Sequence, residues 1–120
     1  MNHNAHFKEY VMGDLFAEMQ GVTVRAMFGG YGIYKNSVFF AIIVDGKLFF
    51  KVGDSNRKEY EEHGIKPFTY KMPNGKPYQM SYWQVPEEIM ENREVFSSWV
   101  SKAVIASLTA KKMKPKPVKK

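Results

Sequence analysis

The strongest hydrophobic pattern along the chain lies at positions 39–52. Two apolar runs, residues 39–44 and residues 47–52, flank the dipeptide Asp45-Gly46. Asp-Gly between two such runs favours a two-residue hairpin turn, because both residues tolerate a positive φ angle. The pattern therefore predicts a β-hairpin in which Val44 faces Lys47 and the other pairs follow in register.

The two faces of this hairpin differ in character. Side chains alternate between faces along a strand, and one face is wholly apolar and is predicted to form the core: Phe39, Ala41, Ile43, Leu48, Phe50 and Val52. The other face combines apolar residues with lysines: Phe40, Ile42, Val44, Lys47, Phe49 and Lys51. Monomers seldom expose large apolar patches, so we expect a cover for this second face, either a terminal helix of the same chain, a second copy or a protein partner.

Hydrophobic periodicity places helices around this hairpin. Apolar residues at three- and four-residue steps, together with capping residues, predict helices over residues 4–20, 54–64 and 92–110 and a helical turn at 86–88. Alternating residues predict further strands over 22–28, 33–35, 68–72 and 78–85. This order predicts an α+β fold: two layers, with an antiparallel sheet of five to six strands and helices packed mainly on one face.

Several motifs along this order are similar to those of the TfoX N-terminal domain. They are the run from Arg25 to Tyr34, the hairpin from Phe40 to Lys51, Pro67-Phe68-Thr69-Tyr70, Met80-Ser81-Tyr82-Trp83 with Val85-Pro86, and the closing helix with Trp99 and Ala103. The resemblance covers residues 7 to 110 and implies a fold of the secretion-chaperone-like type. It also implies a stand-alone form of the domain found in the TfoX/Sxy regulators of natural competence, and it carries no catalytic residues over.

The net charge of +6 is concentrated at one end of the chain. Six of the eighteen basic residues fall in the last ten positions: Lys111, Lys112, Lys114, Lys116, Lys119 and Lys120. Residues 1–110 therefore hold twelve basic and twelve acidic residues. We therefore expect one domain at 1–110 and a disordered lysine-rich tail at 111–120. These six lysines give the alternative function, an accessory nucleic-acid-binding protein whose tail supplies weak, salt-sensitive affinity.

Candidate chemistry for catalysis is sparse. The chain has no cysteine and three histidines, at His3, His6 and His63, and they lack the spacing of a metal site. Ser81 has no histidine near it in sequence, and the glycines at 29, 30 and 32 lie between two strands rather than before a helix, as a phosphate loop requires. We expect no enzyme, no cofactor and no bound metal.

Cations inside apolar strands are the remaining signal. Arg25 is a candidate contact for an anion or an acidic partner, and the candidate interface on the second hairpin face comprises Phe40, Ile42, Lys47, Phe49 and Lys51. We expect a cytoplasmic, non-enzymatic module that binds a protein partner or itself, since no stretch has the length of a membrane span or the pattern of a signal peptide.

Overall fold

The structure is a computed structural model that describes residues 3–27 and 29–113. Its helical elements are α1 (His3–Tyr10), the π-helical turn η1 (Val11–Leu15), α2 (Arg57–Glu62), α3 (Glu87–Met90) and α4 (Arg93–Met113). Its strands are β1 (Val22–Met27), β2 (Gly30–Lys35), β3 (Val38–Val44), β4 (Lys47–Lys51), β5 (Pro67–Lys71) and β6 (Pro77–Gln84). The predicted α+β fold is confirmed.

One antiparallel sheet contains all six strands, in the order β1-β2-β3-β4-β6-β5. The central hairpin has the predicted register: Val44 pairs with Lys47, Ile43 with Leu48, Ile42 with Phe49 and Ala41 with Phe50. Asp45 and Gly46 both have positive φ angles, 54° and 68°, as the two-residue turn requires. The strands at the two edges of the sheet are β1 and β5.

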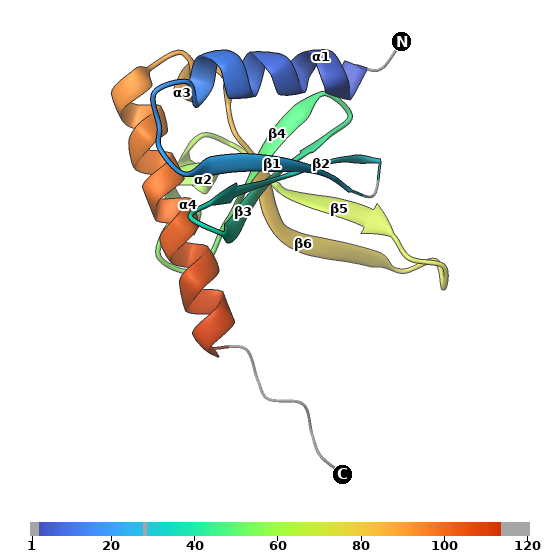
Figure 1. The fold of residues 1–120 in the computed structure, drawn as a ribbon. Helices are drawn as coiled ribbons and strands as arrows, with labels where there is room; N and C mark the ends of the chain where they lie inside the picture. The colour runs from blue at the N-terminus through green and yellow to red at the C-terminus, as the bar shows by residue number, and fades with distance from the viewer. Residues whose placement is uncertain (1–2, 28, 114–120) are drawn as a thin grey trace.

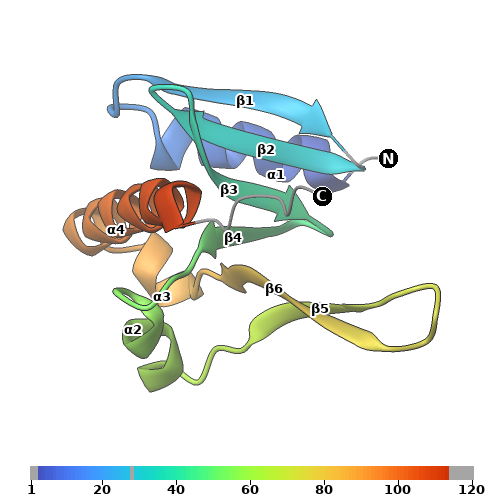
Figure 2. The ribbon, with the colours of Figure 1, turned by 90° about the horizontal axis from the view of Figure 1, so that it is seen from below.

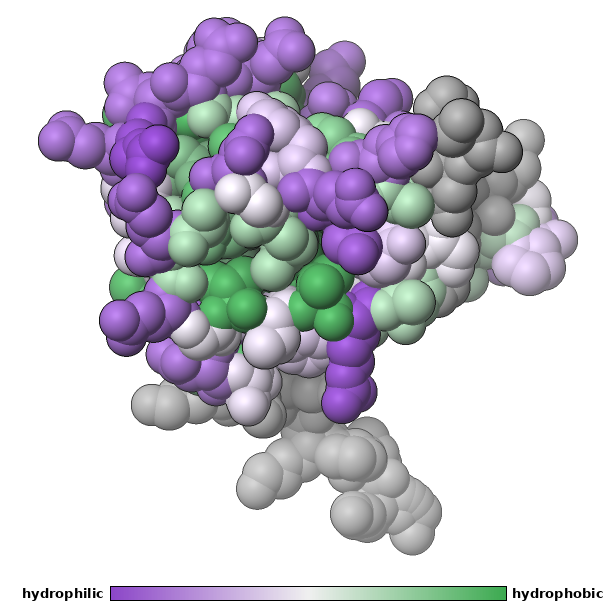
Figure 3. Space-filling view, turned by 45° about the horizontal axis from the view of Figure 1, so that its top comes forward, coloured by the Kyte–Doolittle hydropathy of each residue, from purple (hydrophilic) through white to green (hydrophobic). Residues whose placement is uncertain are grey.

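The helices pack mainly on one face of the sheet (Figures 1 and 2). Helix α4 crosses β3 and β4, and α1 lies over β2 and β3. Between them lies the main core, whose largest fully buried side chains include Phe40, Phe50, Tyr60 and Phe96. From the side of α1 and the edge strand β1, the surface is a band of apolar side chains surrounded by hydrophilic ones (Figure 3). The opposite face of the sheet carries no helix, and we call it the open face.

A β-bulge in β3 changes which phenylalanine reaches the main core. Ile33 pairs with Ala41 but Tyr34 pairs with Phe39, so Phe40 has no partner on β2. An extra residue of this kind rotates the strand, and the residues before it change sides. Phe40 is therefore fully buried under the helices and Phe39 lies on the open face, so the predicted positions of these two residues were wrong.

The β5–β6 hairpin extends from the body as an arm (Figures 1 and 2). Strand β6 pairs with β4 only through Tyr82, Trp83 and Gln84. Closer to the turn, β6 pairs with β5, as in the pair of Thr69 with Gln79. The arm is thus a two-stranded ribbon beside the open face.

Helix α4 continues to Met113, three residues into the segment that the sequence assigns to the tail. Its C-terminal end points to the side of the sheet that lies away from α1 (Figures 1 and 2). Helix α4 therefore ends on the open-face side of the molecule. Within residues 3–27 and 29–113, no helix has the length and hydropathy needed to cross a bilayer.

Candidate functional site

The open face carries a second apolar cluster, separate from the main core. Its buried members are Ile42, Phe49 and Tyr82, and half-buried Phe39, Val44, Phe68 and Met80 pack around them. These side chains come from four neighbouring strands, β3, β4, β6 and β5. The alternation that places Ile42 and Phe49 here is the one that the hairpin register predicts.

The cover over this cluster comes from the chain itself. Ile42 is 2% exposed and Phe49 is 5% exposed, so neither offers an accessible anchor for a partner. The Phe68 ring of β5 lies 5.1 Å from the Phe49 ring, although β5 is not adjacent to β4 in the sheet. Curling of the sheet toward the arm thus provides a cover that was not among those we expected, a terminal helix, a second copy or a protein partner.

A row of aromatic rings crosses the open face, with a cation at each end. The ring centroids of Tyr34 and Phe39 are 5.2 Å apart, and those of Phe39 and Tyr82 are 5.8 Å apart. The Arg25 guanidinium lies 5.8 Å from the Tyr34 ring, and the Lys51 ammonium lies 5.3 Å from the Tyr82 ring. Tyr34 and Phe39 are half-buried and so keep ring surface in contact with solvent.

Lys51 has neutral partners only. Its Nζ donates a hydrogen bond to Ser81 Oγ at 2.5 Å, and burial lowers the pKa of its ammonium group. Burial also raises the pKa of Tyr82, to about 12, with a smaller contribution from Tyr34. Among the described residues, none of the ion pairs involves Lys51, Arg25 or Lys47. These three cations are therefore available to an anion from outside.

The fold separates the charges of the domain. The six strands contain five basic residues and no acidic one: Arg25, Lys35, Lys47, Lys51 and Lys71. Eleven of the twelve acidic residues lie on the helices or in the turns next to them, and the exception is Asp45 in the central hairpin turn. Arg25, Lys47 and Lys51 share the open face by their register. A domain that is neutral in sequence thus has a cationic sheet face.

A shallow hollow marks one border of the open face. It has a volume of about 210 Å³ and lies between the central hairpin turn and the start of β5. Lys47, Lys66 and Asp45 line it together with Phe49 and Phe68. The hollow therefore brings together three charged side chains, two of them lysines, and the edge of the apolar cluster.

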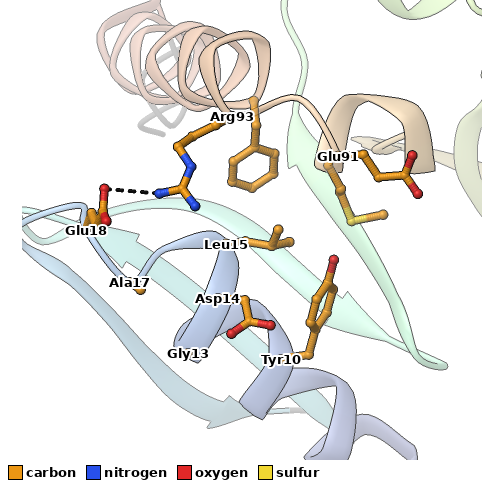
Figure 4. Close-up of a pocket in the computed structure, with 10 residues that line it drawn as sticks. Tyr10, Gly13, Asp14, Leu15, Ala17, Glu18, Glu91 and Arg93 are labelled. Atoms are coloured by element: carbon orange, nitrogen blue, oxygen red, sulfur yellow. Dashed lines mark ion pairs between the residues drawn. The ribbon is translucent and has the colours of Figure 1, made fainter.

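A larger cleft lies on the helical side, between η1 and the start of α4 (Figure 4). Its volume is about 410 Å³, and Leu15 and Phe96 line it. The Arg93 guanidinium binds the Glu18 carboxylate at 3.0 Å, and both residues belong to the lining. The remaining charged lining residues, Asp14 and Glu91, are acidic. No pattern in the sequence predicts this cleft, whose charge is opposite to that of the open face.

The other candidates from the sequence lie apart from one another. His63 Nε2 lies 3.4 Å from Glu88, and the described part of the chain contains no group of three or more metal-ligating side chains. Gly30 lies against the backbone of β3, where an added Cβ would approach the Ile43 carbonyl oxygen to 2.0 Å, so this glycine serves close packing. Lys111 and Lys112 lie in the last turn of α4, and the other tail lysines lie outside the described residues: Lys114, Lys116, Lys119 and Lys120.

Comparison with known proteins supports the resemblance noted in the sequence. The family model of the TfoX N-terminal domain matches residues 14–107, which is most of the chain. One relative, the DNA transformation protein TfoX1 of Aliivibrio fischeri, is 33% identical over 46 residues. That segment is 38% of this chain and 22% of the relative, so the match spans less than a quarter of the relative's length.

Proposed function

Because this chain belongs to the TfoX N-terminal domain family, we propose that it is a non-enzymatic regulatory module that binds an anionic partner through the open face of its sheet. The name of its relative, the DNA transformation protein TfoX1, supports a role in the control of competence. The module would act by contact and not by chemistry, in the way of an adaptor between other molecules of a regulatory system.

Charge separation is the observation that carries this proposal. The open face presents Arg25, Lys47 and Lys51, and the six strands contain no carboxylate. An anion placed 4 Å from a cation near a protein surface gains about 4 kcal/mol before desolvation is counted. Complementary charge of this kind selects partners and speeds association. An acidic protein surface or a nucleic acid would satisfy it.

A second copy of the chain satisfies this face poorly. Two open faces placed against each other would bring Arg25, Lys47 and Lys51 of one copy near the same cations of the other. Like charges across an interface cost several kcal/mol and act against that pairing. We therefore favour a different, acidic molecule over self-association through this face.

The lysine-rich tail is a second candidate site, for nucleic acid. Helix α4 ends on the open-face side of the molecule, so the tail begins there (Figure 1). Six lysines release counterions when they contact phosphates and give salt-dependent affinity without sequence preference. The tail would then add to the affinity of the open face.

Elution from a heparin column tests the proposal with a simple polyanion. We expect the full chain with Arg25→Gln and Lys47→Gln to elute at a clearly lower salt concentration than the wild-type chain. The matched control, Arg57→Gln with Lys58→Gln, removes the same charge from exposed positions on α2 and should elute close to wild type. A variant with glutamine in place of the six tail lysines measures how much the tail contributes to heparin binding. Equal shifts for the face variant and the α2 control would contradict the proposal.

A further inference from the structure

Resting on the proposed function, we propose that the partner of the open face is a single-stranded nucleic acid, whose bases stack on Tyr34 and Phe39 while its phosphates bind Arg25 and Lys47. Aromatic rings and cations without ion-pair partners among the described residues lie together on one side of an antiparallel sheet.

The aromatic row has the arrangement that base stacking requires. Tyr34 and Phe39 are on adjacent strands, their centroids are 5.2 Å apart, and both are half-buried. Rings on the open face of an antiparallel sheet can stack two or three unpaired bases. Stacking tolerates any sequence because every base has a π face. Tyr82 continues the row, with its ring centroid 5.8 Å from that of Phe39, but Tyr82 is 9% exposed. It therefore packs beside Phe39 and is not itself a stacking surface.

The cations lie where a backbone that crosses the rings would pass. Arg25 pairs with Gly32 in the register of β1 and β2, and its guanidinium lies 5.8 Å from the Tyr34 ring. Lys47 lies at the opposite side of the apolar cluster, where it borders the 210 Å³ hollow with Lys66. Positive charge interleaved with rings is typical of proteins that bind single strands.

The apolar part of the face favours a nucleic acid over an acidic protein segment. Protein interfaces gain most of their affinity from large side chains that enter accessible apolar pockets near the centre of the contact. The side chains at the centre here, Ile42 and Phe49, are 2% and 5% exposed and are already packed against Phe68 and their other neighbours. The accessible surface around that centre belongs to the cations and to half-buried side chains, which include the rings of Tyr34 and Phe39 as well as Val44 and Met80. Bases can contact the rings and phosphates can contact the cations.

Single-stranded nucleic acid fits better than a duplex for a related reason. In a duplex the base faces are stacked on each other and cannot reach Tyr34 or Phe39. A duplex would contact the cations alone and would lose the stacking contribution. We therefore expect the rings to matter for single strands and to have little effect on duplex binding.

Fluorescence anisotropy with the full chain tests this inference. The probes are labelled dT12, a 12-base-pair duplex and a peptide of twelve glutamates. We expect Tyr34→Leu and Phe39→Leu each to weaken dT12 binding by about 5- to 150-fold, which is the range for loss of one stacked base. The control Tyr10→Leu removes an exposed ring from α1 and should leave the affinity unchanged. Circular dichroism confirms that each variant remains folded.

The outcomes separate this inference from the proposed function. Loss of dT12 binding in the ring variants, with duplex binding unchanged, supports both. Binding of dT12 that is equal in the ring variants and in wild type overturns the inference. If the glutamate peptide binds and Arg25→Gln with Lys47→Gln abolishes its binding, the proposed function holds and the partner is an acidic protein. If none of the three probes depends on those two cations, the proposed function fails as well.

Discussion

Replacing Phe39 and Phe40 one at a time with alanine tests the β-bulge that sets the two faces of the sheet. Without the bulge, strict alternation would place Phe39 in the main core and Phe40 on the open face. The structure has the reverse: Phe40 is fully buried, 5.9 Å from the Phe16 ring and 5.6 Å from the Phe50 ring. Phe39 is half-buried among the rings of the open face.

The expected loss of stability is about twice as large for Phe40→Ala as for Phe39→Ala at the centre of each range. Removing a buried phenylalanine side chain from a packed core costs about 3–5 kcal/mol, through lost transfer free energy and the cavity left behind. This range applies to Phe40→Ala. Phe39→Ala loses contacts with two rings and less buried area, and at about 0.5–1.5 kcal/mol for each aromatic pair we expect a cost of about 1–3 kcal/mol. A total stability of about 5–15 kcal/mol leaves both variants folded at the upper end of that range.

Urea unfolding followed by tryptophan fluorescence measures both values. With a dependence on urea of about 2 kcal/mol per molar, we expect the midpoint to fall by about 2 M for Phe40→Ala and by about 1 M for Phe39→Ala. Should Phe40→Ala fail to fold, Phe40→Leu retains most of the volume and still gives a measurable difference from Phe39→Leu. An equal or larger loss for the Phe39 variant would refute the bulge and the assignment of faces that depends on it.

Three further predictions concern single polar groups. Asn56→Ala should destabilise the domain by about 1–3 kcal/mol in urea unfolding, because the buried Asn56 side chain accepts a hydrogen bond from the Gly53 amide and donates one to the Lys51 carbonyl. Tyr60→Phe should leave stability unchanged or raise it by about 1 kcal/mol, because the buried Tyr60 hydroxyl has no hydrogen-bond partner among the residues that the structure describes. A loss of stability of about 1 kcal/mol or more would show that the hydroxyl is paired. For Tyr82, burial first and a neighbouring tyrosine second raise the pKa from 10.0 to about 12. The unfolded state therefore releases this proton first, and the folded state loses stability as the pH rises from 10 toward 12. Tyr82→Phe should lack this part of the alkaline loss, and identical pH profiles for wild type and variant would contradict the assignment.

Local sequence signals were sufficient for the central hairpin. Asp45-Gly46 fixes the turn, and with a two-residue turn every pair from Val44 and Lys47 outward is determined. The same reasoning identified the open face through Ile42 and Phe49. These predictions succeeded because they depend on contacts between residues close together in the chain.

The β-bulge in β3 and the change from α1 to the π-helical turn depend on contacts with other parts of the chain, and the hydrophobic pattern of a segment does not contain that information. Phe39 and Phe40 are both phenylalanine, so hydrophobicity cannot say which one turns inward. The register of β2 decides it, through Tyr34. Residues 4–20 have one helical period, but the structure changes from α1 at Tyr10 to the π-helical turn Val11–Leu15, around Gly13. A π-helical turn has i→i+5 hydrogen bonds in place of i→i+4, so the helical period no longer predicts which residues continue the apolar face.

The cover over Phe49 was unpredictable for a different reason. Phe68 is nineteen positions later in the chain and lies on a strand that is not adjacent in the sheet. Their rings meet only because the sheet is curved, and curvature accumulates over several strands. A two-layer scheme allows only a helix or a partner as the cover of an exposed sheet face, so it omits the case in which the sheet covers itself.

The charge of the open face follows from topology and not from composition. Residues 1–110 hold twelve basic and twelve acidic residues, and this count alone argues against a polyanion as partner. Folding places eleven of the twelve acidic residues with the helices and leaves Arg25, Lys47 and Lys51 on the other side of the sheet. At physiological ionic strength a field from such a surface extends only about 8 Å, so it acts chiefly on a molecule already in contact. In the proposed complex, specificity then resides in the residues that touch the partner, and the ring faces of Tyr34 and Phe39 would be the contacts that distinguish a base from any other group that accompanies negative charge.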